Sequence, residues 1–248
     1  MKYSNKIICL FSLFLLSITT GCSTLKSTDD ISKQVSSDPF EGINRAVYGF
    51  NNTADKVILK PVAKAYTYVV PKPVNNSISN FFNNLSEPLN IVNNALQGKG
   101  GRALNSTYRL VINSTIGMLG LFEVAEHYNI QPAREDLGQT FASWGIKPGP
   151  YVMVPFLGPT NFRDGFGRIV QSAAYYGPDV ISDSDSVQVG LTVLNVVETR
   201  ASFLNLDPLI ESQFDQYDFF KNAFETDRID KIYDRNAPES KEEFEFDF

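Results

Sequence analysis

Cysteine is almost absent from this chain of 248 residues, which contains only Cys9 and Cys22. Cys9 lies inside an apolar N-terminal run that we expect to be cleaved off. A mature chain that starts at Cys22 would then have no second cysteine with which to form a disulfide. It would also lack a free thiol nucleophile and a cysteine-based metal site.

Histidine is equally scarce, because His127 is the only one. A single histidine excludes a multi-histidine zinc site, and no G-x-S-x-G motif provides a nucleophile for it. The run Gly98-Lys99-Gly100-Gly101 lacks the spacing of a phosphate-binding loop. The adjacent charges of Glu135-Asp136 are of a kind that is usually solvated or structural. We therefore expect no enzymatic activity, no metal and no cofactor.

Positive charge is in deficit. The chain has 22 lysines and arginines against 28 acidic residues, and loss of residues 1–21 with Lys2 and Lys6 leaves 20 against 28, a formal net charge of −8. Nucleic-acid binding requires basic patches, so we expect no nucleic-acid partner. The same balance argues against holding anionic lipid head groups by bulk charge.

Long apolar runs are also missing. The run Ile7–Ile18 follows Lys2 and Lys6 and is too short for a bilayer span, which takes roughly 20 apolar residues. Thr-Thr-Gly-Cys at 19–22 then resembles a lipoprotein cleavage site, although Thr19 stands where Leu is usual. We predict a signal peptide over 1–21 and lipidation of Cys22. The alternative is an ordinary signal peptide with a stray cysteine. Ser23 after the cysteine is compatible with sorting to the outer membrane.

Two flanking segments are polar. We predict that residues 22–37 form a tether between the lipid and the folded domain. At the other end, residues 237–248 carry five acids and one lysine, and we expect this tail to be solvated. Its alternating Phe244, Phe246 and Phe248 leave open a strand-like recognition tail.

Residues 38–236 form one predicted domain with helical apolar spacing and almost no strand alternation. The class predicted is all-α, built from short amphipathic helices with irregular segments around 98–103, 126–135 and 145–160. Asp38 is the expected N-cap of the first helix. Further helix starts are expected near Pro61, Pro73, Ser86, Leu104, Leu137, Phe166, Val187 and Asp207. The 19 phenylalanines and 11 tyrosines fit either an aromatic core or helices lying in a membrane interface.

The stretch from Pro148 to Phe162 contains no charge, yet it holds four prolines and two glycines. Proline at that density forbids a long helix and argues against a central strand. A stiff, extended apolar segment remains, followed at once by Arg163 and Asp164. It is either a core loop or part of a surface for an amphipathic ligand such as a lipid.

Several blocks in order resemble the MlaA (VacJ) family of outer-membrane lipoproteins. They are DPFEGINRAVYGFN at 38–51, LKPVAKAY at 59–66, NFFNNLSEPLNIVNNALQG at 80–98, STIGMLGLFEVA at 114–125, EDLGQTFASWGIKPGPYVMVPFLGPTNFRD at 135–164 and VETRA at 197–201. The G-x-x-x-G-P-Y-x-x-x-P-F-x-G-P block over 145–159 is the most specific of these.

This resemblance implies a ring of helices in the inner leaflet of the outer membrane, around an amphipathic channel. Family members sit against trimeric porins and pass phospholipid to a soluble periplasmic carrier of the MlaC type. The implied task is to remove phospholipid misplaced in the outer leaflet. A lipoprotein that only docks on a porin, and a membrane-bound lipid hydrolase using His127, remain alternatives.

The candidate residues follow from this expectation. We predict that Met153, Phe156 and Leu157 touch acyl chains, and that Asn90, Asn94, Arg163 and Asp164 polarise the channel or fix its rim, although each could be purely structural. A further set, Gly149, Pro150, Pro155, Gly158 and Pro159, is expected to set backbone shape.

Overall fold

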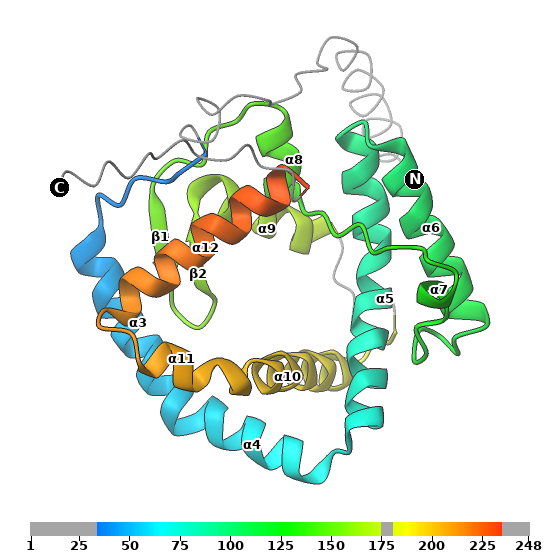
Figure 1. Ribbon diagram of the computed structural model, residues 1–248, viewed down its shortest axis with the longest axis horizontal. Helices are drawn as coiled ribbons and strands as arrows, with labels where there is room; N and C mark the ends of the chain where they lie inside the picture. The colour runs from blue at the N-terminus through cyan, green and yellow to red at the C-terminus, as the bar shows by residue number, and fades with distance from the viewer. Residues whose placement is uncertain (1–33, 175–180, 235–248) are drawn as a thin grey trace, which may run out of the picture.

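A computed structural model describes residues 34–174 and 181–234. Its helices are arranged as a ring (Figure 1). One arc is continuous in sequence: α3 (Glu41–Ala54), a π-helical turn (Asp55–Leu59), α4 (Lys60–Val69) and α5 (Lys72–Leu96). The first two helices and α5 are amphipathic, as the apolar spacing predicts.

Outside α5 lies α6 (Gly100–Thr115), which packs against it along its length, followed by the short α7 (Val124–His127). The arc continues with α8 (Leu137–Ser143), an antiparallel hairpin of β1 (Tyr151–Val154) and β2 (Gly158–Asn161), and α9 (Phe162–Ala174). The hairpin packs against α3, and this contact completes the ring.

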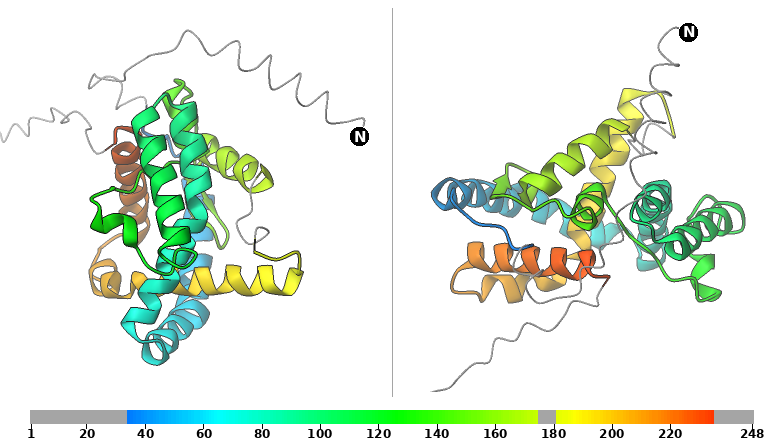
Figure 2. Two further views of the ribbon diagram at one scale, coloured as in Figure 1. Left: turned by 90° about the vertical axis from the view of Figure 1, so that its right-hand side faces the viewer. Right: turned by 90° about the horizontal axis from the view of Figure 1, so that it is seen from above.

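The last helices brace the ring from both sides. The helix α10 (Asp185–Ser202) contacts α4 and α5, whereas α11 (Asp207–Glu211) and α12 (Gln216–Ile232) form a layer on the opposite side of the ring (Figure 2). The cluster of buried hydrophobic side chains lies where α12 meets the hairpin and consists of Tyr151, Met153, Tyr217 and Phe224.

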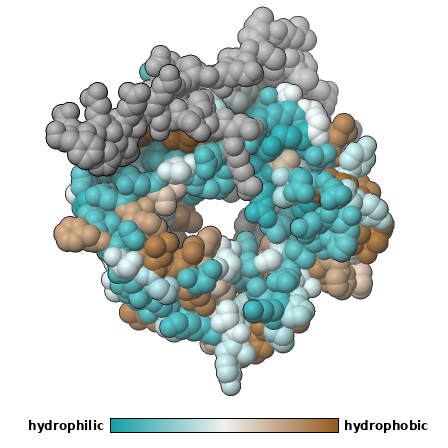
Figure 3. All heavy atoms as spheres, in the orientation of Figure 1, coloured by the Kyte–Doolittle hydropathy of each residue, from teal (hydrophilic) through white to brown (hydrophobic). Residues whose placement is uncertain are grey.

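An opening passes through the middle of the ring (Figure 3). The visible face is mostly hydrophilic, but hydrophobic side chains border the opening on the side where Figure 1 draws the hairpin turn. Among the described residues, no helix combines the length and apolarity needed to cross a membrane.

An ionic cluster joins α10 to the arc. Arg200 donates two hydrogen bonds to Asp55, at 2.7 and 2.9 Å, and one to Asp207 at 2.9 Å. Lys60 then links Asp207 (3.0 Å) to Glu211 (2.7 Å). Charge-assisted, bidentate pairs of this kind fix geometry as well as supplying energy.

The structure confirms a mostly helical ring and corrects several details. The segment 145–160, expected to be irregular, contains the hairpin. The irregular segment expected over 98–103 is largely the first turn of α6. One helix, α5, replaces the two expected around Ser86, with Pro88 inside it. The helix expected from Asp207 onward is broken, and Phe214 lies in the break between α11 and α12.

Two corrections concern the N-terminal end. Asp38 does not cap α3; its carboxylate instead accepts hydrogen bonds from Asn44 (2.8 Å) and the Tyr217 hydroxyl (2.6 Å). Residues 34–37, expected to belong to the tether, pack into the fold, and Gln34 and Ser36 are buried. The signal peptide, Cys22 and the tail over 237–248 lie outside the described residues.

Candidate functional site

The hairpin turn, which Figure 1 draws beside the opening, exposes two large apolar side chains. Phe156 is 76% exposed and Leu157 73% exposed. Phe156 also has a positive φ of 63°, a conformation that is costly for an aromatic residue. A strained residue that carries an exposed ring is the kind of feature found at functional sites. Because both side chains are exposed, Phe156 and Leu157 could make the predicted contacts with acyl chains without a change in the conformation of the hairpin.

Two asparagines on one face of α3 hold the hairpin. Asn44 donates to the Tyr151 carbonyl (3.1 Å) and accepts from the Met153 N–H (2.9 Å). Two turns later, Asn51 donates to the Val154 carbonyl (3.0 Å) and accepts from the Phe156 N–H (2.8 Å). Because each amide pairs with both a donor and an acceptor of the hairpin backbone, these side chains fix the position of the turn.

A shallow apolar groove of about 600 Å³ runs between α3 and the turn. Its lining is Gly42, Ile43, Ala46, Val47, Phe50, Pro155 and Phe156. The rings of Phe50 and Phe156 meet edge to face with their centroids 5.1 Å apart. The turn therefore continues a larger hydrophobic surface and is not an isolated apolar tip.

Met153 does not match its expected role. It is only 3% exposed and packs in the hydrophobic cluster with Tyr151 and Tyr217. Strand alternation explains the difference, because Met153 shares the inward face of β1 with Tyr151. A direct contact with acyl chains is therefore ruled out for Met153 in this conformation.

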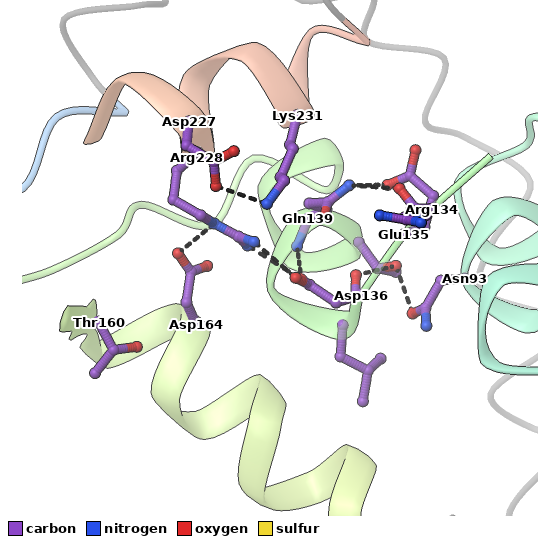
Figure 4. A network of polar contacts seen from close by, with 12 residues as sticks. Asn93, Arg134, Glu135, Asp136, Gln139, Thr160, Asp164, Asp227, Arg228 and Lys231 are labelled. Carbon is purple, nitrogen blue, oxygen red and sulfur yellow. Dashed lines mark hydrogen bonds and ion pairs between the residues drawn. The ribbon is translucent and has the colours of Figure 1, made fainter. Parts of the chain in front are cut away.

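Arg163 and Asp164 begin a buried ionic network, and Figure 4 shows the part of it that is formed by Asp164, Arg228 and Asp136. Arg163 and Asp164 pair with each other at 2.8 Å, and Asp164 also pairs with Arg228 of α12 at 2.9 Å. Arg228 in turn donates to both carboxylate oxygens of Asp136, at 2.6 and 3.1 Å. Burial opposes ionisation of Asp136, but the hydrogen bonds and charge of Arg228 hold the pKa of Asp136 below its usual value.

Two glycines allow this network to form. A β-carbon on Gly138 of α8 would collide with the Asp164 carboxylate, and one on Gly167 of α9 would lie 2.8 Å from the Gly138 nitrogen. The close approach of α8 to α9 therefore brings Asp136 and Asp164 to the same guanidinium. The network joins α8, α9 and α12 behind the hairpin.

Asn90 and Asn94 serve a second buried network, between α5 and the segment before α8. Asn90 Oδ1 accepts from the Glu135 N–H (3.1 Å), and Asn94 donates to the Ala133 carbonyl (2.8 Å). Lys99 lies 3.0 Å from the Glu135 carboxylate, whose pKa is nevertheless raised by burial. The four predicted polar residues are thus buried in two networks that shape the ring wall, and none presents its side chain freely to the opening.

The glycines and prolines expected to set the backbone shape lie in or beside the hairpin. Gly149 and Gly158 have φ values of 70° and 82°, in the left-handed region that favours glycine. Pro150 precedes β1, Pro155 lies in the turn, and Pro159 stands opposite Met153 in the ladder. Asn44, Asn51 and Arg228 were not among the residues predicted from the sequence. The seven-residue spacing of the two asparagines, off the apolar stripe of α3, was an available signal.

These features define a ring-shaped, mostly helical protein with an exposed apolar hairpin turn at a central opening. The chain belongs to the MlaA lipoprotein family, whose model matches residues 36–231. A relative from Escherichia coli K12, the intermembrane phospholipid transport system lipoprotein MlaA, is 35% identical over 84% of this chain and 81% of its own length. The protein of that name from Haemophilus influenzae is 30% identical over 98% and 96%.

A solved structure agrees with this assignment. It was described as the structural basis for maintenance of bacterial outer membrane lipid asymmetry, and it matches with a TM-score of 0.70 and 36% identity. The match covers 79% of this chain and 99% of that one. An uncharacterised protein from Rickettsia typhi is 31% identical over 77% of this chain.

Proposed function

We propose that this chain is a lipoprotein of the outer membrane, anchored through Cys22 on the periplasmic side, that keeps the membrane asymmetric by removing phospholipid misplaced in the outer leaflet. The lipid passes through the opening of the ring. The observation that carries the proposal is the exposed, clamped turn with Phe156 and Leu157 beside an opening in a mostly hydrophilic face. The names of the relatives support the same role.

The physical problem is to move a polar head group through hydrocarbon, which is costly when the group is not compensated. An opening that holds water on one side and has an apolar turn on the other provides a separate path for each part of the lipid. The head group stays solvated while the acyl chains slide over Phe156, Leu157 and the groove beside α3. No bond is made or broken, so the protein acts as a passive route.

The exposed apolar side chains of the helices support a position within one leaflet. Exposed apolar side chains follow helical spacing on several helices, including Leu104, Tyr108 and Val111 on α6, Phe166 and Ile169 on α9, and Val189, Val193 and Val196 on α10. Large exposed apolar areas mark contact with membranes or proteins, and short amphipathic helices can lie in the interface. A trimeric porin beside the ring and a soluble carrier of the MlaC type below it are the partners we propose.

Surface exposure of phospholipid in cells with and without the gene tests the function. Deletion should raise surface phospholipid, and the intact gene should restore the low level, whereas a Cys22→Ala form should not. A deletion strain with normal surface phospholipid would point instead to a structural lipoprotein docked on a porin.

We also propose that the protein has no hydrolase activity. His127 lies exposed at the end of α7, where its Nδ1 is 3.2 Å from the carbonyl oxygen of Glu123, and no serine, threonine or cysteine side chain within residues 34–174 and 181–234 is hydrogen-bonded to its ring. Purified protein incubated with phospholipid vesicles should release no fatty acid. Release that disappears in a His127→Ala variant would contradict this.

A further inference from the structure

The segment Gln34–Ser37, called the strap from here on, is built into the fold just before α3. Gln34 and Ser36 are 4% and 5% exposed, whereas Val35 between them is 49% exposed. The side chains of Gln34 and Ser36 therefore face the protein, although the backbone turns at Gln34 and bends at Val35. The strap is thus a fitted element, and it is the last part of the chain between the expected lipid anchor and the ring.

The strap touches both ends of the hairpin base. The Ser37 carbonyl accepts a hydrogen bond of 2.7 Å from the N–H of Tyr151, the first residue of β1. The Gln34 side chain accepts one from the guanidinium of Arg163, which lies two residues after the end of β2. Tyr151 and Asn161 are partners in the ladder. The two contacts therefore lie at the base of the hairpin, one on the rung formed by Tyr151 and Asn161 and the other just after that rung.

A two-stranded hairpin is marginally stable by itself, so its position depends on what holds it. Two asparagines of α3 hold β1 along its length, Asn51 at the tip and Asn44 nearer the base. The strap adds two contacts at the base from the other side of the chain. Loss of either attachment should let the strands pivot on the other. The place of Phe156 and Leu157 beside the opening then depends on both.

The attachment of the strap to α12 is weaker. The Ser36 N–H donates to the Glu225 carboxylate over 3.3 Å. Three buried oxygens around this contact have no hydrogen-bond partner within the described part of the chain: Ser36 Oγ, Tyr151 OH and Glu225 Oε1. Unsatisfied buried oxygens reduce the net stability of a contact. The strap is therefore held mainly by its two bonds to the hairpin base.

We propose that the strap is a positioning segment for the hairpin turn, so that lipid passage depends on residues 34–37 themselves and not only on the length of the tether to Cys22. This inference rests on the proposed function. A tether without such a role could be changed residue by residue without consequence for the turn.

The test combines strap variants with a reporter on the turn. In the mature lipoprotein Cys22 is acylated and no other cysteine is present, so Leu157→Cys supplies a single thiol for a nitroxide label. Gln34→Ala removes the acceptor for Arg163, and Ser36→Pro removes the N–H that faces Glu225. Val35→Ala is the matched control, because its side chain points outward.

We expect Gln34→Ala to raise the mobile fraction of the label by roughly five-fold, the effect of a lost hydrogen bond of ordinary strength, and Ser36→Pro to raise it less, because it removes only the weaker bond to α12. In cells without the label mutation, the same variants should raise surface phospholipid toward the level of the deletion strain. The control should change neither quantity. Thermal unfolding of each variant shows whether the ring is still folded at the temperature of the measurement.

Unchanged label mobility in both strap variants, or an equal change in the control, would overturn the inference. Increased mobility with normal surface phospholipid would also overturn it, because the turn would then move without affecting passage. Failure of the proposed function is a separate result: the deletion strain itself would show normal surface phospholipid, while the label would still report whether the strap positions the turn.

Discussion

Asn51 Oδ1 accepts a hydrogen bond from the backbone N–H of Phe156 at 2.8 Å, and this bond stabilises a residue with positive φ. The same amide donates to the Val154 carbonyl. One side chain on α3 thereby holds both sides of the hairpin turn.

Replacement of Asn51 by Asp should release only half of this attachment, because a carboxylate still accepts from Phe156 but no longer donates to Val154. Asn51→Ala should release all of it. We expect surface phospholipid to be lowest in the wild type, higher in Asn51→Asp and highest in Asn51→Ala. The melting temperature of the purified protein should change little. Identical behaviour of the two variants would contradict a dual role for the amide.

A charge on the turn tests the acyl route. Phe156→Asp should reduce lipid passage strongly and leave the fold intact, because the side chain is 76% exposed. Phe214→Asp is the matched control, since Phe214 is fully exposed in the break between α11 and α12. The measurement is surface phospholipid in cells that express equal amounts of each protein. Normal lipid asymmetry in the Phe156→Asp strain would show that Phe156 does not contact the passing lipid.

Ionisation of Glu225 makes the free energy of unfolding change with pH. Burial raises the pKa of its carboxyl above the unfolded value, so the ionised form costs stability at neutral pH. This cost disappears as the pH falls below the unfolded pKa, roughly 4.3. Glu225→Gln should therefore raise the melting temperature at pH 7 by roughly 2–4 °C, equivalent to about 1 kcal/mol in a domain of this size, and should give no gain near pH 4.

Glu126→Gln provides the control for that experiment, because Glu126 is exposed on α7. It should give the same melting temperature as the wild type at both pH values. A stabilisation by Glu225→Gln that persists unchanged at pH 4 would show that ionisation is not its cause.

Gly138→Ala should destabilise the ring by roughly 1–3 kcal/mol, the usual cost of overpacking a core. The added methyl group would meet the Asp164 carboxylate and lie 2.7 Å from an Arg228 nitrogen. In contrast, the methyl group added by Gly190→Ala in α10 would have no heavy atom within 4 Å. This substitution should stabilise the helix slightly. Urea unfolding of the two variants measures both effects, and equal midpoints would exclude the crowding at Gly138.

Much of the fold could be predicted from local patterns, and the exceptions have physical reasons. The helix expected to start near Leu137 is α8, which Asp136 caps and which Gly145 follows with positive φ. Pro88 lies within α5 because packing along α6 offsets the roughly 3 kcal/mol that an interior proline costs. Pro159 is tolerated in β2 because neither strand of a two-stranded sheet is central.

The site was only partly predictable because burial is a property of the three-dimensional arrangement. Phe156 and Leu157 are exposed as expected, while Met153 in the same apolar stretch is buried. Nothing local distinguishes them, since the difference arises from the register of the hairpin against α12. The pairing of Asp164 with Arg228 could not be predicted for the same reason. Arg228 lies 64 positions further along the chain and reaches Asp164 only when α12 packs against the rest of the ring.

The pair formed by Arg200 and Asp55 joins residues 145 positions apart. The attachment of α10 to the arc is therefore a late, long-range event, which loop entropy makes slow compared with the formation of single helices. A chain that emerges N-terminus first holds α4 and α5 without their contacts to α10 until residues 185–202 have followed. The apolar surface that α10 covers is exposed in that interval, and exposed apolar surface makes partly folded chains prone to aggregation.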